Sequence, residues 1–150
     1  MSITLQSNNF DIKYLYFLQK VKNNVKQNSY FSRLIYSNDV FSLKNIYIPF
    51  TINNVQYKEQ FLKTNILFDE TKNSLEHLYK IEKNILDHYM EHSNENLVPS
   101  YCIYNQCKSN YIKIFKNNLL SVDSKSITIY VKISGIWHTG SNIGLTYKFI

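Results

Sequence analysis

Glycine, proline, cysteine and tryptophan are all scarce in this 150-residue chain, with three, two, two and one copies respectively. Two thiols, Cys102 and Cys107, give no disulfide framework, so reduced cysteines are the simpler expectation. No stretch reaches the roughly 20 apolar residues of a membrane span. The first residues, "MSITLQSNNF", lack the charged start and apolar run of a secretory signal. The sequence therefore predicts a cytoplasmic protein without a membrane partner.

Motifs for catalysis or cofactor binding are also missing. The stretch "GIWHTGS" (135–141) has the glycine spacing of a phosphate-binding loop, but Ser141 stands where that loop needs lysine. A strand-like run rather than a helix follows it. There is no G-x-G-x-x-G motif, nucleophile motif or pair of carboxylates with catalytic spacing. We therefore expect neither an enzyme nor a cofactor.

One set of residues invites a metal interpretation. His88 and His92 are four residues apart in a helical pattern, and Cys102 and Cys107 follow them, which are ligand types that zinc uses. Solvent-facing helix positions, His77 included, explain the histidines more simply. No metal is expected on this ground.

Positive charge is present in excess, and it is carried almost entirely by lysine. Lys and Arg number 17 against 11 Asp and Glu, for a formal charge of +6, and Arg33 is the only arginine. A basic chain favours a polyanionic partner. Lysine meets phosphates as a point charge and reads base edges less well than arginine does, which favours sequence-tolerant binding. The abundance of Asn, Lys, Ile and Tyr is typical of an AT-rich genome, so positions carry more weight than counts.

Seven short runs rich in Ile, Val, Tyr and Phe have the composition of β-strands. Asn-rich segments separate several of them, as expected at turns. The predicted strands cover residues 12–18, 30–36, 43–50, 64–68, 111–115, 127–133 and 143–150.

The segment 69–92 has helical periodicity instead. Asp69 or Thr71 suits its start, and the helix is expected over about residues 70–91. Its apolar residues recur at helical spacing at Leu75, Leu78, Tyr79, Ile85, Leu86 and Tyr89.

The order of strands, one long helix and more strands predicts the fold class. A small, mainly β barrel with a helix between its third and fourth strands is the oligonucleotide/oligosaccharide-binding (OB) architecture. We therefore predict a single domain over residues 1–150, built as an OB-like five-stranded barrel.

All three glycines fall in the final predicted hairpin. Gly135 is expected at a bulge or sharp bend. Gly140 lies in "TGSN", where a turn favours positive φ. Gly144 opens the return strand, where a missing side chain permits close approach by another group. Together they predict a strongly curved closing hairpin.

Two stretches carry a family resemblance: "VKISGIWHTGSNIGLTYKFI" (131–150) and "LYKIEKNILDHY" (78–89). They resemble the single-stranded DNA-binding proteins of large eukaryotic DNA viruses and of the cytoplasmic virus-like linear plasmids of yeasts. The resemblance covers about the last 25 residues and the helix, but not the first 60. It implies an OB-like fold that binds single-stranded DNA. Two departures stand out, because His138 replaces a frequently acidic residue and the sequence ends at Ile150 without the acidic tail that recruits replication proteins.

Alternation along the strands suggests which side chains meet the DNA. In 111–115, Ile112 and Ile114 are expected in the core, with the aromatic–lysine–aromatic set facing outward to stack on bases and meet phosphates. In 127–133 the isoleucines and valine point inward. The candidate DNA-binding residues are Tyr111, Lys113, Phe115, Tyr130, Lys132, Trp137, Arg33, Tyr47 and Lys148.

Alternative roles remain open for several of these residues. Tyr111 and Phe115 are equally suited to the core, Trp137 to a core anchor, and Arg33 to a solvated strand edge. The leading hypothesis is a sequence-tolerant single-stranded DNA-binding protein of an AT-rich virus-like element, with replication proteins and further copies of the chain as other candidate partners. An assembly subunit of a replication or transcription complex and an RNA-binding accessory domain are the alternatives.

Overall fold

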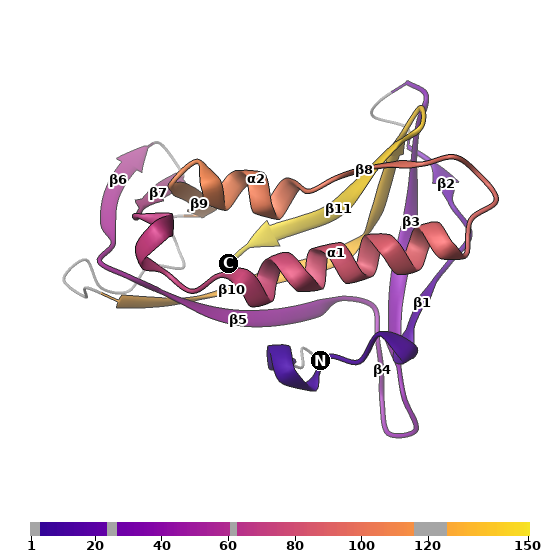
Figure 1. The fold of residues 1–150 in the computed structure, drawn as a ribbon, viewed down its shortest axis with the longest axis horizontal. Helices are drawn as coiled ribbons and strands as arrows, with labels where there is room; N and C mark the ends of the chain where they lie inside the picture. Colours follow the sequence, from indigo (N-terminus) through magenta and orange to yellow (C-terminus); the bar gives the residue numbers. More distant parts are fainter. Residues whose placement is uncertain (1–3, 24–26, 61–62, 116–125) are drawn as a thin grey trace.

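The computed structural model describes residues 4–23, 27–60, 63–115 and 126–150. Strands make up 48% of the described residues and helices 24%, so the mainly β prediction is confirmed. Figure 1 shows the α-helices beside the strands. In chain order the elements are η1 Ser7–Asn9, η2 Ile12–Tyr14, β1 Leu15–Phe17, β2 Val21–Lys22, β3 Ser29–Ser37, β4 Ser42–Leu43, β5 Ile46–Asn53, β6 Gln56–Gln60, β7 Lys63–Leu67, η3 Glu70–Lys72, α1 Glu76–Glu91, β8 Val98–Ser100, α2 Cys102–Lys108, β9 Tyr111–Phe115, β10 Ser126–Thr139 and β11 Asn142–Phe149.

The long strand β10 organises the main sheet. Its first half, Ser126–Ile133, pairs with β5, and its second half, Gly135–Thr139, pairs with β3. On its other side β10 pairs with β11, and β8 adds a short parallel strand to β11. The ladder to β11 is irregular between Ile133 and Gly135, so the predicted bulge is confirmed. A bulge bends its strand, and β10 exchanges β5 for β3 at the same point.

The described strands form two sheets rather than the expected five-stranded barrel. The second sheet has the order β6-β7-β9, and no pairing between the two sheets occurs among the described residues. Figure 1 shows this second sheet at the left, across the molecule from β3 at the right. Two of its strands were predicted, but β6, β2 and β8 were not. The short strands lack the β-branched runs on which the prediction relied.

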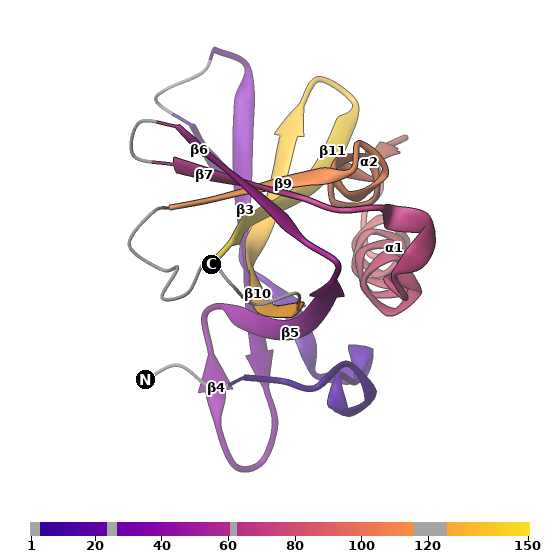
Figure 2. The same cartoon turned by 90° about the vertical axis from the view of Figure 1, so that its left-hand side faces the viewer.

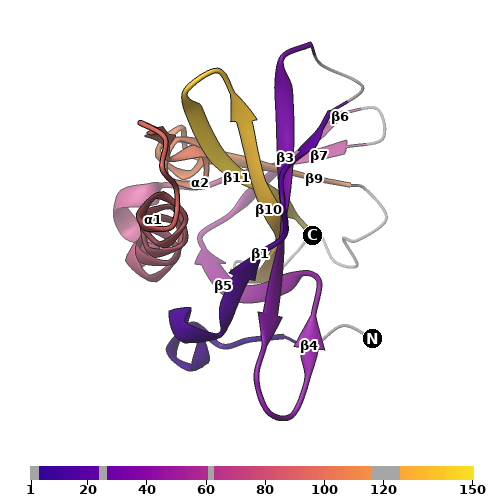
Figure 3. The ribbon, with the colours of Figure 1, turned by 90° about the vertical axis from the view of Figure 1, so that its right-hand side faces the viewer.

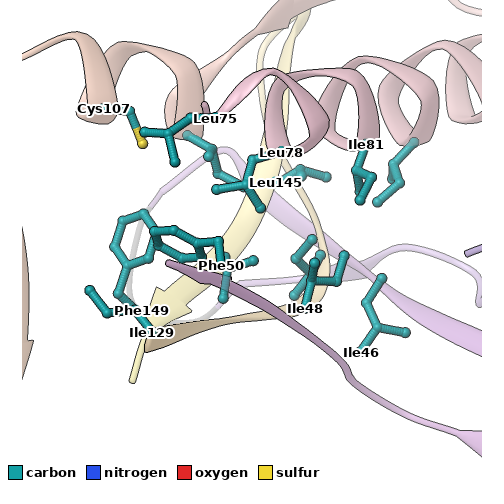
Figure 4. Packing of buried hydrophobic residues seen from close by; sticks show 14 of the residues in the cluster. Ile46, Ile48, Phe50, Leu75, Leu78, Ile81, Cys107, Ile129, Leu145 and Phe149 are labelled. Atoms are coloured by element: carbon teal, nitrogen blue, oxygen red, sulfur yellow. The ribbon is translucent and has the colours of Figure 1, made fainter. Parts of the chain in front are cut away.

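One apolar core joins the two sheets and the helices. In Figure 4, Leu75, Leu78 and Ile81 lie over Ile46, Ile48 and Phe50 of β5, with Ile129, Leu145 and Phe149 beside them. In the second sheet Ile66, Ile112 and Ile114 are buried in the same core. Figures 2 and 3 show both helices on the same side of β3, β10 and β11. The main sheet therefore has one face covered by helices and another that we call the outer face.

The predicted helix exists but starts later than expected. Asp69 accepts a hydrogen bond from the Thr71 amide and so caps the separate 3₁₀ turn η3. The amide of Asn73 also closes that turn, on the Glu70 carbonyl, and α1 begins at Glu76 with Leu75 at its N-cap. The predicted apolar stripe is confirmed, because its leucines and Ile85 are buried and its tyrosines are partly buried against the core.

The helix α2 was not predicted. Its first turn depends on a residue from α1, because the Glu82 carboxylate accepts hydrogen bonds from the amides of Ile103 and Tyr104 at 2.7 and 3.0 Å. Glu82 is fully buried, and its burial raises the pKa of its carboxyl group while these backbone bonds act in the opposite direction. A cap supplied from 21 residues away leaves no local signal in the sequence.

Candidate nucleic-acid interface

The outer face of the main sheet brings together six of the nine candidate residues. Side chains of directly paired residues lie on the same face of a sheet. Lys132 of β10 pairs with Tyr47 of β5 on one side and with Lys148 of β11 on the other. The neighbours Val131 and Ile133 are buried on the helix-covered face, which fixes the orientation of the strand. Tyr47, Lys132 and Lys148 therefore form a row across three strands of the outer face.

The bulge in β10 keeps Trp137, and Arg33 opposite Gly135, on the same face, and Tyr130 lies there two residues before Lys132. After Ile133 the ladder skips Ser134, and the buried positions become Ile136 and His138. Gly135 and Trp137 consequently face outward beside Lys132. The six residues assembled on the outer face are Arg33, Tyr47, Tyr130, Lys132, Trp137 and Lys148.

Two aromatic rings lie against this face over glycines. A Cβ atom on Gly144 would come within 2.5 Å of the Trp137 indole, so the indole lies over Gly144, its cross-strand partner. A Cβ atom on Gly135 would come within 2.7 Å of the Phe31 ring and 2.2 Å of the Ser32 carbonyl oxygen. The close approach expected at Gly144 is confirmed. Phe31 was missed, although it lies two residues before Arg33 in the same strand and therefore shares its face.

The outer face carries positive charge without acidic neighbours on its own strands. Strands β3, β5, β10 and β11 contain no Asp or Glu. The Arg33 guanidinium lies 5.5 Å from the centroid of the Phe31 ring, a cation–π distance. Arg33 belongs to a central strand that pairs with both β1 and β10, so the solvated-edge alternative is wrong. Aromatic rings and cations are thus interleaved on one face of the main sheet.

The candidates on β9 lie in the second sheet. Ile112 and Ile114 are buried, Lys113 is exposed and Tyr111 is half-buried, so the predicted alternation of β9 is confirmed for these four residues. The Lys113 ammonium lies 5.9 Å from the centroid of the Tyr111 ring. The side chain of Phe115 lies outside the described residues.

A cavity of about 720 Å³ opens on the helix-covered side, between β1 and the last turns of α1. Its wall includes a chain of hydrogen bonds in which the Tyr89 hydroxyl contacts Ser32 Oγ at 3.1 Å and His138 Nε2. Burial lowers the pKa of the His138 imidazole, and the nearby Lys20 ammonium acts in the same direction. His138 is only 3% exposed, so this departure from the resembled family faces the cavity rather than the outer face.

The zinc arrangement of histidines with cysteines does not form. Cys107 is fully buried against the core near Leu75, and Cys102 Sγ lies 3.7 Å from the carbonyl oxygen of Ser100. The potential metal-binding group found among the described residues consists of His88, Glu91 and His92, without either cysteine. No helix in the described part of the chain has the length and apolar character needed to cross a membrane.

Known proteins were compared with this chain by sequence and by structure. A scan of family models, a search of curated proteins and a search of solved structures each found no match.

Proposed function

We propose that the chain binds single-stranded DNA with little sequence preference and protects it during replication of an AT-rich virus-like or plasmid genome. The observation that carries this proposal is the outer face, where Tyr47, Tyr130 and Trp137 share one surface with Arg33 and the lysines of β10 and β11. Aromatic rings stack on bases of any sequence, and cations follow the phosphates. The resemblance of residues 131–150 to viral and plasmid single-strand binders supports the same function. The proposal includes a distant relation to the OB architecture, because the sheet is curled and has a helix on one face.

The chain contains its own probe for this test. Trp137 is the only tryptophan, and its indole lies on the proposed binding face. Adding oligo-dT should therefore quench its fluorescence and give a titration curve. Binding should weaken with salt, with a logarithmic slope of about −0.7 for each phosphate contact on a single strand. An unchanged emission together with a flat salt response would reject the proposal.

A pair of lysine variants ties the binding to the face. Lys132→Ala removes a cation from the middle of the outer face, whereas Lys80→Ala removes an exposed one from helix α1. We expect the first change to weaken binding and to lower the salt slope by about 0.7, and the second to leave both unchanged. Equal effects of the two substitutions would show that net charge, rather than this surface, attracts the DNA. Competition between oligo-dT and oligo-U then separates DNA binding from the RNA-binding alternative.

The assembly-subunit alternative has one observation in its favour. Tyr16, Leu18 and Val21, at the β1 and β2 edge, are 56%, 52% and 59% exposed. Exposed apolar side chains along a sheet edge are typical of protein interfaces. A Leu18→Glu variant that keeps its affinity for oligo-dT but loses binding to a replication protein would assign the two activities to different surfaces.

A further inference from the structure

The last turn of α1 and its C-cap residue carry the sequence His-x-x-Glu-His. His88 and His92 are one helical turn apart and lie on the same side of the helix, with Glu91 between them in sequence. A ligand atom from each of the three residues lies within 4.8 Å of the other two. Imidazole nitrogens and carboxylate oxygens are the ligands that zinc accepts besides thiolates. This grouping does not involve the outer face, so it is independent of DNA binding.

Hydrogen bonds to the backbone set the tautomer of both imidazoles. His88 Nε2 lies 3.1 Å from the carbonyl oxygen of Leu15, and His92 Nδ1 lies 2.8 Å from the carbonyl oxygen of His88. A carbonyl oxygen only accepts, so these two nitrogens must carry the protons. In the neutral rings, His88 Nδ1 and His92 Nε2 then hold the lone pairs. A histidine that binds a metal nearly always donates its other N–H in this way.

The surroundings leave the carboxylate of Glu91 available. Its neighbours are already paired, because Asp87 contacts Lys83 at 2.6 Å and Glu95 contacts Lys20 at 2.9 Å. Among the described residues, Glu91 makes no ion pair and is exposed. His88 and His92 also line the cavity of about 720 Å³, which has room for a water molecule in a fourth coordination position.

We propose that His88, Glu91 and His92 bind a divalent transition-metal ion of the zinc class at the rim of this cavity. Two nitrogens and one carboxylate suit zinc, whereas calcium and magnesium require sets made mainly of oxygen ligands. The bound ion would hold the His88 ring in the orientation in which it donates to the Leu15 carbonyl of β1. Binding to the folded state alone would also stabilise the protein against unfolding.

Titration of the chelator-treated chain with Zn²⁺, followed by calorimetry, tests the site directly. We expect binding of one ion per chain, with His92→Ala and Glu91→Gln each lowering the affinity at least about tenfold. His77→Ala, on the same helix but outside the cluster, is the matched control and should bind as the wild type does. His92 and Glu91 are both exposed, so their replacement should leave the circular dichroism spectrum unchanged.

Cobalt substitution identifies the ligand atoms. The Co²⁺ complex should show the visible absorption of a nitrogen–oxygen site without a thiolate charge-transfer band, and Cys102→Ser should not alter it. Thermal unfolding should shift upward with zinc in the wild type but not in His92→Ala. The proposal is wrong if the wild type does not bind zinc or if His92→Ala keeps full zinc affinity. It is also wrong if a thiolate band appears and is lost in Cys102→Ser. Oligo-dT binding by the same variants is a separate measurement, so failure of the metal site leaves the DNA proposal untouched.

Discussion

The two faces of the main sheet are built on the same strands but have opposite chemistry. Side chains on the helix-covered face of β10 are mostly aliphatic and buried, whereas those on the outer face include tyrosine, lysine and tryptophan. The charges follow the same division. The segment 69–95, which includes α1, contains seven acidic residues and three lysines, while β3, β5, β10 and β11 contain cations and no acid. One face thus holds the fold together, and the other carries the aromatic rings and the cations.

The largest effect is expected on the covered face. Ile129 is 1% exposed, so Ile129→Ala should leave a cavity and lower the free energy of unfolding by about 2–5 kcal/mol. Its neighbour Tyr130 points outward and is 38% exposed, so Tyr130→Ala should cost far less stability. Denaturant unfolding of the two variants measures the contrast. If both lose the same stability, the division between the faces is wrong.

A substitution at Gly144 should disturb the outer face from beneath. In Gly144→Ala the new methyl group would lie within 2.5 Å of the Trp137 indole, so the ring must move. We expect a loss of about 1–3 kcal/mol in unfolding free energy, a shift in tryptophan emission and weaker binding of oligo-dT. Fluorescence spectra and melting curves check this together. Unchanged emission would mean that the indole does not rest on Gly144.

Tyr130 and Tyr104 provide a matched test of stacking. Their exposures are similar, 38% and 41%, but Tyr130 lies on the outer face and Tyr104 on helix α2. Tyr130→Ala should weaken binding to oligo-dT by about 1–3 kcal/mol through the loss of one stacked base. Tyr104→Ala should bind as the wild type does in the same titration. A loss confined to Tyr104→Ala would move the binding site to the helices.

The smallest effect is a pH dependence from the cavity. Burial lowers the pKa of His138 below its ordinary value of 6.5, so the unfolded chain takes up a proton at higher pH than the folded chain does. This contribution to stability is complete above about pH 6.5 and is lost as the pH falls toward the folded pKa, with a slope of at most about 1.4 kcal/mol per pH unit. His138→Gln cannot titrate and should flatten the melting-temperature profile between about pH 7 and 5. His77, whose pKa burial also lowers, should keep part of the slope. A profile as steep as the wild type would assign the dependence to other groups.

Alternation was the sequence signal that predicted most about this molecule. It correctly placed Ile112, Ile114, Ile129 and Val131 in the core, because each sits in a strand long enough to show period two. Glycine spacing likewise predicted the bulge, the close approach over Gly144 and the turn at Gly140, where φ is +60°. These features depend on neighbours in sequence, so local patterns record them.

Features that depend on distant residues were missed. The start of α2 is stabilised by Glu82, and the two-sheet topology depends on which partner β10 selects along its length. The outer face was predicted only as separate residues, since cross-strand register decides that Tyr47, Lys132 and Lys148 adjoin. The sequence singled out His88 and His92 but grouped them with the two cysteines, and it missed Glu91, because only the fold shows that the cysteines lie apart from the histidines.

The exchange of partners by β10 has a consequence for synthesis on the ribosome. Strands β3 and β5 both receive their β10 partner only from residues 126–139. Until these residues emerge, the apolar positions of β5 have no completed sheet in which to be buried. Contacts that span such long sequence separations slow folding and prolong the exposure of apolar strands. The nascent chain should therefore depend on holding factors until its last hairpin leaves the exit tunnel.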